Sequence, residues 1–153
     1  MADSNGPVLV GVDGSKHSID ALRYAADIAA AVRASLRVVT MWEFRVLGLY
    51  YPPDEWSPQT DALKVLNASI AAAFDGALPP GLVKELVEGP TVKTLVEESR
   101  HARMLVLGAR GSGGFARLRL GSVGAACARH AHCPVLLVRA SEAVTPAAGQ
   151  AGR

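Results

Sequence analysis

The residues best suited to bind a ligand lie in one glycine-rich stretch behind an apolar run. Gly108 is followed by Gly111 after two residues, and Gly121 comes nine residues later with Ser122 directly behind it. The apolar residues 104–107 are typical of a buried strand, and a helix is expected from Ser122, which would cap it. Glycines let the backbone approach an oxygen closely, and the first N–H groups of a helix have no partner within it. The stretch therefore predicts a site for phosphate or another anion.

Two better-known phosphate motifs fit this stretch less well. A P-loop requires a lysine next to a Ser or Thr after its last glycine, and no lysine follows Lys93 in the chain. Residues 111–116 match the G-x-G-x-x-G/A dinucleotide pattern, but that pattern belongs in a first strand–helix turn with an acidic residue about 20 positions later. The next acidic residue here is Glu142. A flexible surface loop without a ligand is the remaining alternative.

The glycine spacing, followed by serine, resembles the nucleotide-binding pattern G-x2-G-x9-G-S of the universal stress protein family, in the branch whose members bind ATP. Residues 8–15 (VLVGVDGS) and residues 133–138 (CPVLLV) carry the same resemblance near the two ends of the globular part. Because the three segments occur in the family's order, residues 1–139 are identified as a universal stress protein domain. The resemblance implies ATP as the ligand, together with Mg²⁺.

The resemblance also implies which residues surround the nucleotide. The phosphates would be bound through backbone N–H groups, and through the serine hydroxyl, by Gly111, Gly121, Ser122 and Val123. The adenine would lie among Gly11, Val12, Met41 and Leu107, with Met41 contributing partly through its backbone. The ribose would be held by Asp13 and Gly108.

Two groups of candidates have simpler explanations that stay open. Asp13 precedes Gly14, so a plain turn-forming role is the alternative to a contact with the nucleoside. Arg110, Arg117 and Arg119 are candidates for contacts with phosphate oxygens, but arginines in an exposed loop are commonly just solvated.

Short apolar runs alternate with segments of helical periodicity along the chain. Strands are expected at residues 8–12, 36–41, 82–87, 104–107 and 135–138. Such alternation predicts an α/β fold with an open five-stranded parallel sheet and helices on both faces. The resemblance supplies the Rossmann-like fold of adenine nucleotide alpha hydrolases and the strand order 3-2-1-4-5. In that order Asp13 and the loop 108–121 meet at one crevice, at the switch point of the sheet.

Two of the expected helices carry detailed predictions. Behind Ser57 and the proline that follows it, residues 62–77 should form an amphipathic helix that ends at the Pro-Pro-Gly of residues 79–81. Its inward-facing residues are expected to be Leu63, Leu66, Ile70 and Phe74. In the helix expected at residues 91–101, Glu98 should face outward.

Length and composition limit the possible functions. A chain of 153 residues, half of them hydrophobic, is long enough for one domain with a buried core. The formal net charge of +2 gives no support for nucleic acid as a partner. Residues 1–7 lack the pattern of a signal peptide, and no apolar segment is long enough to span a bilayer. A cytoplasmic protein without a membrane partner is expected.

A small group of cysteines and histidines is the one candidate for metal binding. Cys127 and Cys133 lie close in sequence to His130 and His132, but the spacing fits no familiar zinc pattern. Cys127 should also lie on the buried side of an alanine-rich helix. No metal site is therefore expected.

Two segments are candidates for contacts with other chains. The last strand, Val135 to Val138, is apolar on both faces but lies at a sheet edge in the implied order, which predicts a homodimer through this strand. The segment from Glu43 to Ser57 is rich in aromatic residues, although these are only 5% of the chain. It is interpreted as a lid or a surface for a protein partner, or as a loop folded on its own side chains. Residues 140–153 are expected to be a disordered tail.

The favoured function is an ATP-binding regulatory module in a stress response. The alternative is an enzyme that hydrolyses ATP slowly or transfers its adenylyl group, which requires a metal shell and a base beside the phosphates. Asp13 and His17 are the only candidates near the site, so no catalytic residue is assigned and at most weak hydrolysis is expected. A scaffold that uses no nucleotide is the third hypothesis, and the intact Gly-Ser pair argues against it.

Overall fold

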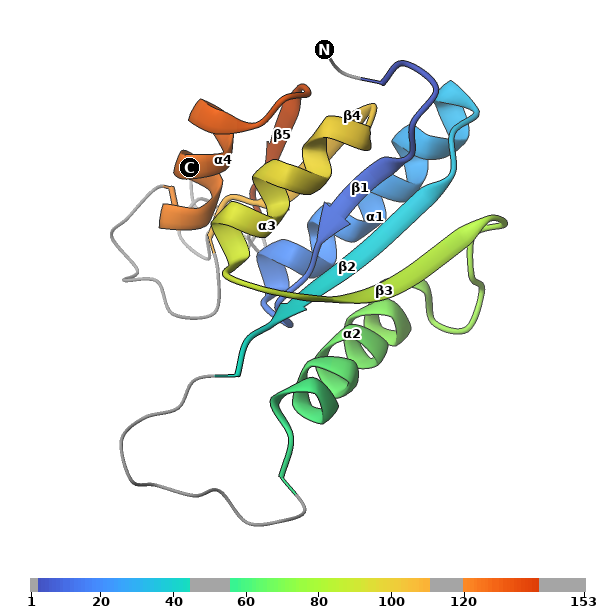
Figure 1. Cartoon of the computed structure of the whole chain (residues 1–153). Coiled ribbons are helices and arrows are strands. Elements are labelled where there is room, and N and C mark those ends of the chain that lie inside the picture. Colours follow the sequence, from blue (N-terminus) through green and yellow to red (C-terminus); the bar gives the residue numbers. More distant parts are fainter. Residues whose placement is uncertain (1–2, 45–55, 111–119, 141–153) are drawn as a thin grey trace, which may run out of the picture.

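The structure is a computed structural model and describes residues 3–44, 56–110 and 120–140. They form a five-stranded sheet in the order β3-β2-β1-β4-β5, in which every neighbouring pair is parallel (Figure 1). The strands are β1 Val8–Gly11, β2 Leu36–Trp42, β3 Leu82–Glu88, β4 Met104–Gly108 and β5 Val135–Val138. The helices are α1 Lys16–Val32, α2 Pro58–Phe74, α3 Thr91–Glu98 with the 3-10 turn η1 Ser99–His101, and α4 Ser122–His130. The predicted fold class and strand order are confirmed.

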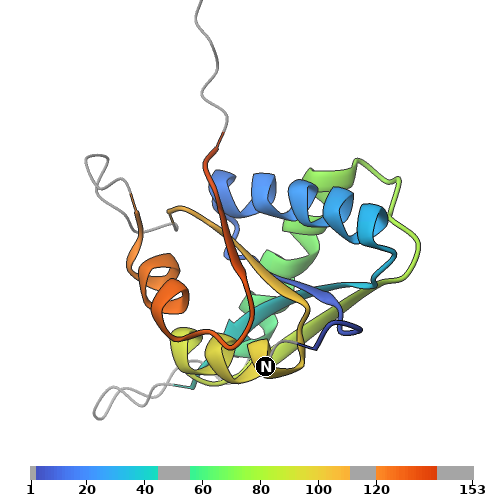
Figure 2. The same cartoon turned by 90° about the horizontal axis from the view of Figure 1, so that it is seen from above.

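The helices cover both faces of the sheet, α1 and α2 on one and α3 and α4 on the other (Figure 2). Val10 of β1 lies in the core cluster with Leu22 of α1, whereas the preceding Leu9 lies in the opposite cluster with Leu95 of α3 and Cys127 of α4. Because successive side chains of a strand point to opposite faces, a central strand covered on both faces must be apolar at every position. This explains the uninterrupted apolar run of β1.

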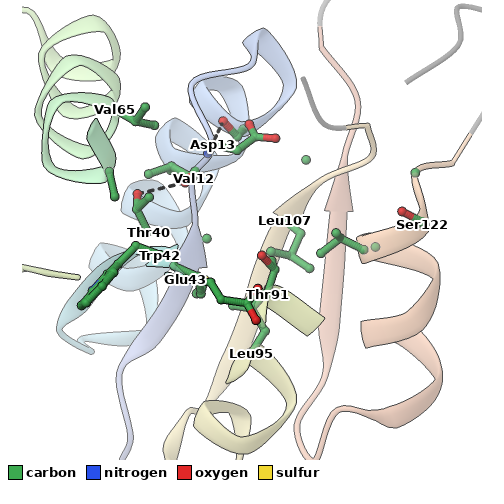
Figure 3. Close-up of a pocket in the computed structure, with 18 of the residues that line it drawn as sticks. Val12, Asp13, Thr40, Trp42, Glu43, Val65, Thr91, Leu95, Leu107 and Ser122 are labelled. Atoms are coloured by element: carbon green, nitrogen blue, oxygen red, sulfur yellow. Dashed lines mark hydrogen bonds between the residues drawn. The ribbon is translucent and has the colours of Figure 1, made fainter. Parts of the chain in front are cut away.

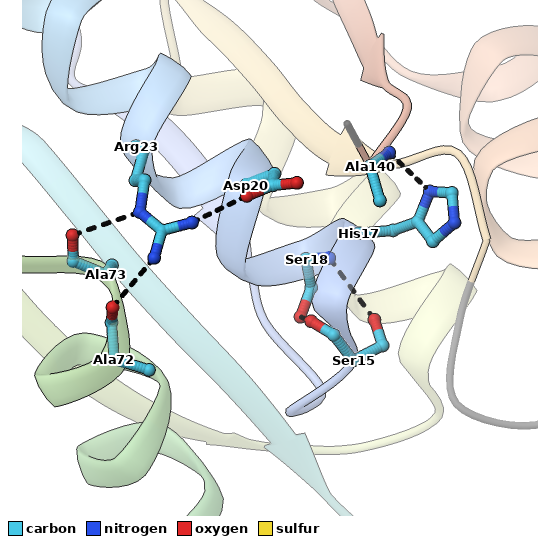
Figure 4. Close-up of polar contacts among 8 residues, drawn as sticks. All are labelled: Ser15, His17, Ser18, Asp20, Arg23, Ala72, Ala73 and Ala140. Atoms are coloured by element: carbon cyan, nitrogen blue, oxygen red, sulfur yellow. Dashed lines mark hydrogen bonds and ion pairs between the residues drawn. The ribbon is translucent and has the colours of Figure 1, made fainter. Parts of the chain in front are cut away.

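Hydrogen bonds from one arginine join α1 and α2, the two helices on the same face of the sheet (Figure 4). Arg23 of α1 donates hydrogen bonds to the carbonyl oxygens of Ala72 at 2.9 Å and Ala73 at 3.2 Å, in the last turn of α2. Asp20 accepts a further bond from the same guanidinium at 2.6 Å. The last carbonyls of a helix lack partners within it, so the Arg23 guanidinium satisfies two carbonyl oxygens of α2 that would otherwise need water.

Helix α2 differs from the prediction in its end and in one of its inward residues. It ends at Phe74 rather than Ala77, because Asp75 (φ 46°) and Gly76 (φ 86°) adopt left-handed conformations before the prolines are reached. Leu63 is 41% exposed, so its placement in the inward stripe is wrong. The buried stripe instead follows Ala62, Leu66, Ser69 and Ile70, and Leu63 lies beside it.

Glu98 of α3 was also expected to face solvent, and that expectation is wrong. Its carboxylate pairs with Arg37 of β2, which pairs at the same time with Glu85 of β3. The three side chains tie α3 to the edge of the sheet, where the strand order leaves β3 unpaired on one side. Within the described ranges, no helix has both the length and the apolar character needed to cross a membrane.

Candidate functional site

The carboxyl ends of β1, β2 and β4 open into one cavity of about 740 Å³ (Figure 3). The first turns of the four described helices reach its wall through Ser18, Asp61, Thr91 and Ser122. Because each helix runs back along the parallel strands, the helix N-termini gather at this edge, where their dipoles favour negative charge. The cavity lies where the strand order reverses between β1 and β4, the usual ligand position in such sheets.

The cavity brings together nearly all the residues that the sequence placed in the site. Its wall includes Gly11, Val12, Asp13, Met41, Leu107, Gly108, Arg110, Gly121, Ser122 and Val123. The remaining predicted residue, Gly111, lies outside the described residues, as do Arg117 and Arg119. Segments more than 100 positions apart, β1 and the start of α4, thus share one cavity.

The floor of the cavity is apolar and tight at its centre. A β-carbon placed on Gly11 would lie 3.0 Å from Cδ2 of Leu107 and 3.4 Å from Cδ2 of Leu95. Together with the half-buried Met41, these leucines form a surface suited to a flat apolar ring. Leu95 was predicted only to face inward, because its position under the site depends on how α3 crosses the sheet.

The N-terminus of α4 is open toward the cavity. Its cap residue is Gly121 (φ −72°, ψ 160°) and not Ser122, which is the first residue of the helix, so the predicted serine cap is displaced by one position. Among the described residues no side chain caps this end, and no acidic residue lies in the first turn. The N–H groups of Ser122 and Val123, both in the cavity wall, therefore have no partner within the helix.

Gly108 has a packing role that does not depend on any ligand. A β-carbon there would lie 2.8 Å from the backbone carbon of His17 and from the backbone nitrogen of Ser18. Only glycine therefore lets the end of β4 approach the first turn of α1 this closely. Gly124 of α4 is less constrained, since its β-carbon would lie 2.9 Å from Cδ2 of Leu137, the end of a side chain that can move.

Asp13 shapes the turn between β1 and α1 while lying at the cavity wall. Its Oδ1 accepts a hydrogen bond from the N–H of Ser15 at 2.9 Å, and its own N–H donates to Oγ of Ser18 at 3.3 Å. Ser15 in turn caps α1 by accepting from the N–H of Ser18 at 3.2 Å. The turn-forming role is thus present, and the exposed carboxylate also borders the cavity.

The backbone groups of Met41, a residue of the cavity wall, lie on the β1 side of β2. The carbonyl of Val39 accepts from Val12 on the β1 side, and the carbonyl of Trp42 accepts from Gly89 on the β3 side, each at 2.9 Å. Backbone groups along a strand alternate between its two edges, so the N–H and C=O of Met41 point to the β1 side. The pairing of β1 with β2 ends at Gly11 and Val39, so these groups lie beyond the last paired residue of β1.

Two acidic residues of the cavity wall were missed by sequence reasoning. Glu43 follows β2 directly, and Asp61 lies in the first turn of α2, where its Oδ2 accepts from the indole N–H of Trp56 at 2.8 Å. The position of Glu43 just behind a predicted strand was a usable signal. Asp61 had none, because α2 reaches the cavity only through its packing beside β2.

The histidines and cysteines named in the sequence lie apart from the cavity. His17 accepts a hydrogen bond at Nδ1 from the N–H of Ala140 at 2.9 Å and is not among the lining residues (Figure 4). Burial, with a smaller contribution from Cys133, raises the pKa of Cys127 to about 11. Burial also raises the pKa of Cys133. In the described part of the chain, no three His, Cys, Asp or Glu side chains form a group that could hold a metal ion.

Comparison with known proteins shows a consistent similarity. The model of the universal stress protein family matches residues 5–139. The universal stress protein Rv2623 of Mycobacterium tuberculosis is 35% identical over 156 residues, which cover 94% of this chain and 51% of the relative. Rv2005c of the same organism is 38% identical over 146 residues, covering 91% of this chain and 50% of the relative. The chain thus spans about half the length of these relatives.

Solved structures show the same similarity in three dimensions. A universal stress protein described in complex with cAMP superposes with a TM-score of 0.66 at 31% identity, covering 91% of this chain and all of the other. UspA from Lactobacillus plantarum superposes with a TM-score of 0.63 at 24% identity and covers 90% and 99% of the two chains. The second likeness, at this identity, concerns the fold alone.

Proposed function

The chain belongs to the universal stress protein family, and from that premise we propose that it binds an adenine nucleotide, ATP with Mg²⁺, in the cavity at the ends of β1 and β4. It acts as a regulatory module in a stress response, in which nucleotide occupancy alters the surface that partners meet. The similar structure described with cAMP supports an adenine nucleotide as the class of ligand.

The observation that carries the proposal is the backbone edge of Met41, which within the described residues has no strand partner on the β1 side and lies beside an apolar floor. Its N–H can donate and its C=O can accept, both lie on the β1 side of β2 beyond the last paired residue, and Met41 borders the cavity. The Watson–Crick edge of adenine offers an acceptor at N1 next to a donor at N6, so the two edges are complementary. With the base on Leu95 and Leu107, the ribose lies toward Asp13 and Gly108, and the phosphates lie toward α4.

The phosphate end combines backbone donors with one guanidinium. The first N–H groups of α4 and the Ser122 hydroxyl supply neutral donors, and Arg110 supplies positive charge. Among the described wall residues three are acidic, Asp13, Glu43 and Asp61, against this single arginine. Mg²⁺ bound to the triphosphate reduces the repulsion between ATP and these carboxylates, which supports the metal–nucleotide complex as the bound form.

A binding role is favoured over an enzymatic one by the wall chemistry. Within the described ranges, the cavity wall contains no histidine, cysteine or lysine. Serine and threonine hydroxyls need an adjacent base to act as nucleophiles. Of the four hydroxyls in the described wall, those of Thr40 and Ser18 donate to backbone carbonyls, and that of Ser122 is assigned to the phosphates. We therefore assign the residues of the site to binding and orientation.

The assembly and location of the protein remain proposals of the same kind. A homodimer through β5 would cover an edge strand whose residues Val135, Leu136 and Leu137 are only half-buried. Residues 45–55 of the aromatic segment lie outside the described residues, but its flanks Phe44 and Trp56 are 54% and 47% exposed, which supports contact with a protein partner there. Sedimentation at tens of micromolar tests the dimer. The cytoplasmic location stays a prediction.

Two measurements test the proposed function. Denaturing the purified protein and identifying any released nucleotide by mass shows what the site carries from the cell. Titration calorimetry with ATP, AMP and cAMP, each with and without Mg²⁺, then measures affinity for the emptied protein. Saturable binding of an adenine nucleotide, strongest for ATP with Mg²⁺, is the expected result. The absence of binding by all three nucleotides would overturn the proposal.

A further inference from the structure

We propose that Thr40 is a positioning residue of the base site, because its hydroxyl occupies the Val12 carbonyl and so leaves the Met41 N–H free for a ligand. The inference rests on the proposed function and deepens it. It assigns part of the selectivity for adenine to a side chain that does not itself contact the base. Thr40 lies on β2 directly before Met41, and both line the cavity.

The hydrogen bond in question is buried and well formed. Oγ1 of Thr40 donates to the carbonyl oxygen of Val12 at 2.9 Å, shown by a dashed line in Figure 3. Thr40 is 6% exposed and Val12 is 5% exposed, so water has little access to this carbonyl. A buried carbonyl needs a donor, and here a side chain supplies it instead of the neighbouring strand.

Regular pairing would give the same carbonyl a different donor. The register pairs Val10 with Val38 and Gly11 with Val39, and the N–H of Val12 still donates to Val39. One step further, Val12 would pair with Thr40, and in a parallel ladder the N–H of Met41 would then donate to the Val12 carbonyl. The register stops before that step. The Thr40 hydroxyl thus satisfies the carbonyl at the point where the strands part.

Removing the Thr40 hydroxyl would change which donor binds the Val12 carbonyl. Valine has nearly the shape of threonine but cannot donate, so Thr40→Val leaves the Val12 carbonyl without its present donor. The nearest donor that regular pairing offers is the Met41 N–H. If the strands pair one step further, this N–H is no longer available for the N1 atom of adenine.

A purely structural role for Thr40 makes a different prediction. In that case replacing Thr40 lowers the stability of the protein and weakens the binding of every nucleotide to the same degree. Under our proposal the loss depends on the base. Inosine presents a donor at N1 and an acceptor at O6, the reverse of adenine, and so cannot use the Met41 groups in the same way. ATP should therefore lose affinity and ITP should not.

The test uses Thr40→Val, with Thr40→Ser as the matched variant that keeps the hydroxyl. Calorimetry with ATP and with ITP, both with Mg²⁺, should show ATP binding weakened by about tenfold or more in Thr40→Val, in keeping with the loss of one hydrogen bond. ITP should change by less than about twofold, and Thr40→Ser should bind both as the unaltered protein does. Thr40→Ala serves as a second variant without the hydroxyl if the valine variant folds poorly.

A second readout needs no nucleotide. Amide hydrogen exchange of Met41 in the ligand-free protein should slow in Thr40→Val by about tenfold, because the N–H gains a partner, and should be unchanged in Thr40→Ser. Unchanged exchange in Thr40→Val, or an equal loss of affinity for ATP and ITP, would overturn the role of Thr40. If the unaltered protein binds no adenine nucleotide, the proposed function fails instead, and the exchange measurement still decides whether Thr40 holds the Met41 N–H free.

Discussion

Gly108 and Ser18 approach so closely that a β-carbon on the glycine would lie 2.8 Å from the backbone nitrogen of the serine. This contact brings the end of β4 against the first turn of α1, and both residues border the cavity. The first glycine of the nucleotide pattern is therefore required by packing before any ligand is considered. A backbone contact cannot be relieved by a change of rotamer, so the neighbouring elements would have to shift.

Gly108→Ala should lower the free energy of unfolding by about 1–3 kcal/mol, the usual range for overpacking a tight site. Urea denaturation of the ligand-free protein measures this. Gly121→Ala is the matched control, because the backbone of Gly121 (φ −72°, ψ 160°) lies in a region open to any residue. Equal stability of the two variants would show that β4 and α1 can separate without penalty.

Gly121→Val should keep the fold and lose nucleotide affinity. Valine accepts the extended backbone of this position, but it would put a branched side chain at the cap residue of α4, next to the N–H groups of Ser122 and Val123 to which a phosphate is expected to bind. We expect ATP to bind at least about tenfold more weakly, which corresponds to about 1.4 kcal/mol. Calorimetry checks the affinity, and circular dichroism checks the fold. ATP affinity equal to that of the unaltered protein would remove the phosphate subsite from α4.

The two roles of Asp13 can be separated by its substitution with Asn and with Ala. Asparagine keeps an oxygen that accepts from the N–H of Ser15, so the free energy of unfolding of Asp13→Asn should stay within about 0.5 kcal/mol of the unaltered protein. Asp13→Ala should lose about 1 kcal/mol. If the carboxylate holds the ribose, both variants bind ATP more weakly. Thermal denaturation and calorimetry together decide the matter. Unchanged ATP affinity in both variants would leave Asp13 with the turn alone.

Burial of Cys127 predicts a loss of stability at high pH. Its native pKa is raised to about 11, above the value of about 8.5 expected in the unfolded chain. The native state therefore binds the proton more tightly, and the contribution is complete below about pH 8.5 and is lost as the pH rises through about 11. The midpoint of urea denaturation, measured from pH 7.5 to 11, should fall more steeply in the unaltered protein than in Cys127→Ala. Parallel curves for the two proteins would contradict the prediction.

Asp75→Gly should stabilise the protein. Asp75 ends α2 with φ 46°, a conformation that costs residues with a β-carbon more than glycine, and its negative charge opposes the helix dipole at a C-terminus. We expect a gain of about 0.5–1 kcal/mol in the free energy of unfolding. Asp75→Ala removes the same charge but keeps the β-carbon, so it should gain less than the glycine variant. A larger gain in the alanine variant would assign the effect to charge alone.

Local patterns in the sequence predicted the alternation of strands and helices and the glycine-rich anion site, and together with the family resemblance they named ten of the residues that line the cavity. β1, β4 and β5 are short apolar runs, whereas β2 and β3 also contain charged residues. Gly108 ends β4, and Gly121 and Ser122 stand at the start of α4. The family resemblance then supplied the strand order that brings Asp13 to the glycine loop. These patterns span only a few residues, because a strand or a helix terminus is specified mainly by its own residues and their near neighbours.

The tertiary structure alone decided the contacts between distant segments. The bond from Thr40 to Val12 spans 28 positions, and the pairing of Arg37 with Glu98 spans 61. Leu95 under the cavity and Gly108 against α1 depend likewise on where one element crosses another. A residue's own type and neighbours specify its propensity and its periodicity, but not which partner another strand or helix brings to it. The sequence by itself therefore predicted an anion site, and the family resemblance put it at the switch point with the backbone of Met41 beside the adenine. The hydrogen bond by which Thr40 satisfies the Val12 carbonyl emerged only when the sheet was assembled.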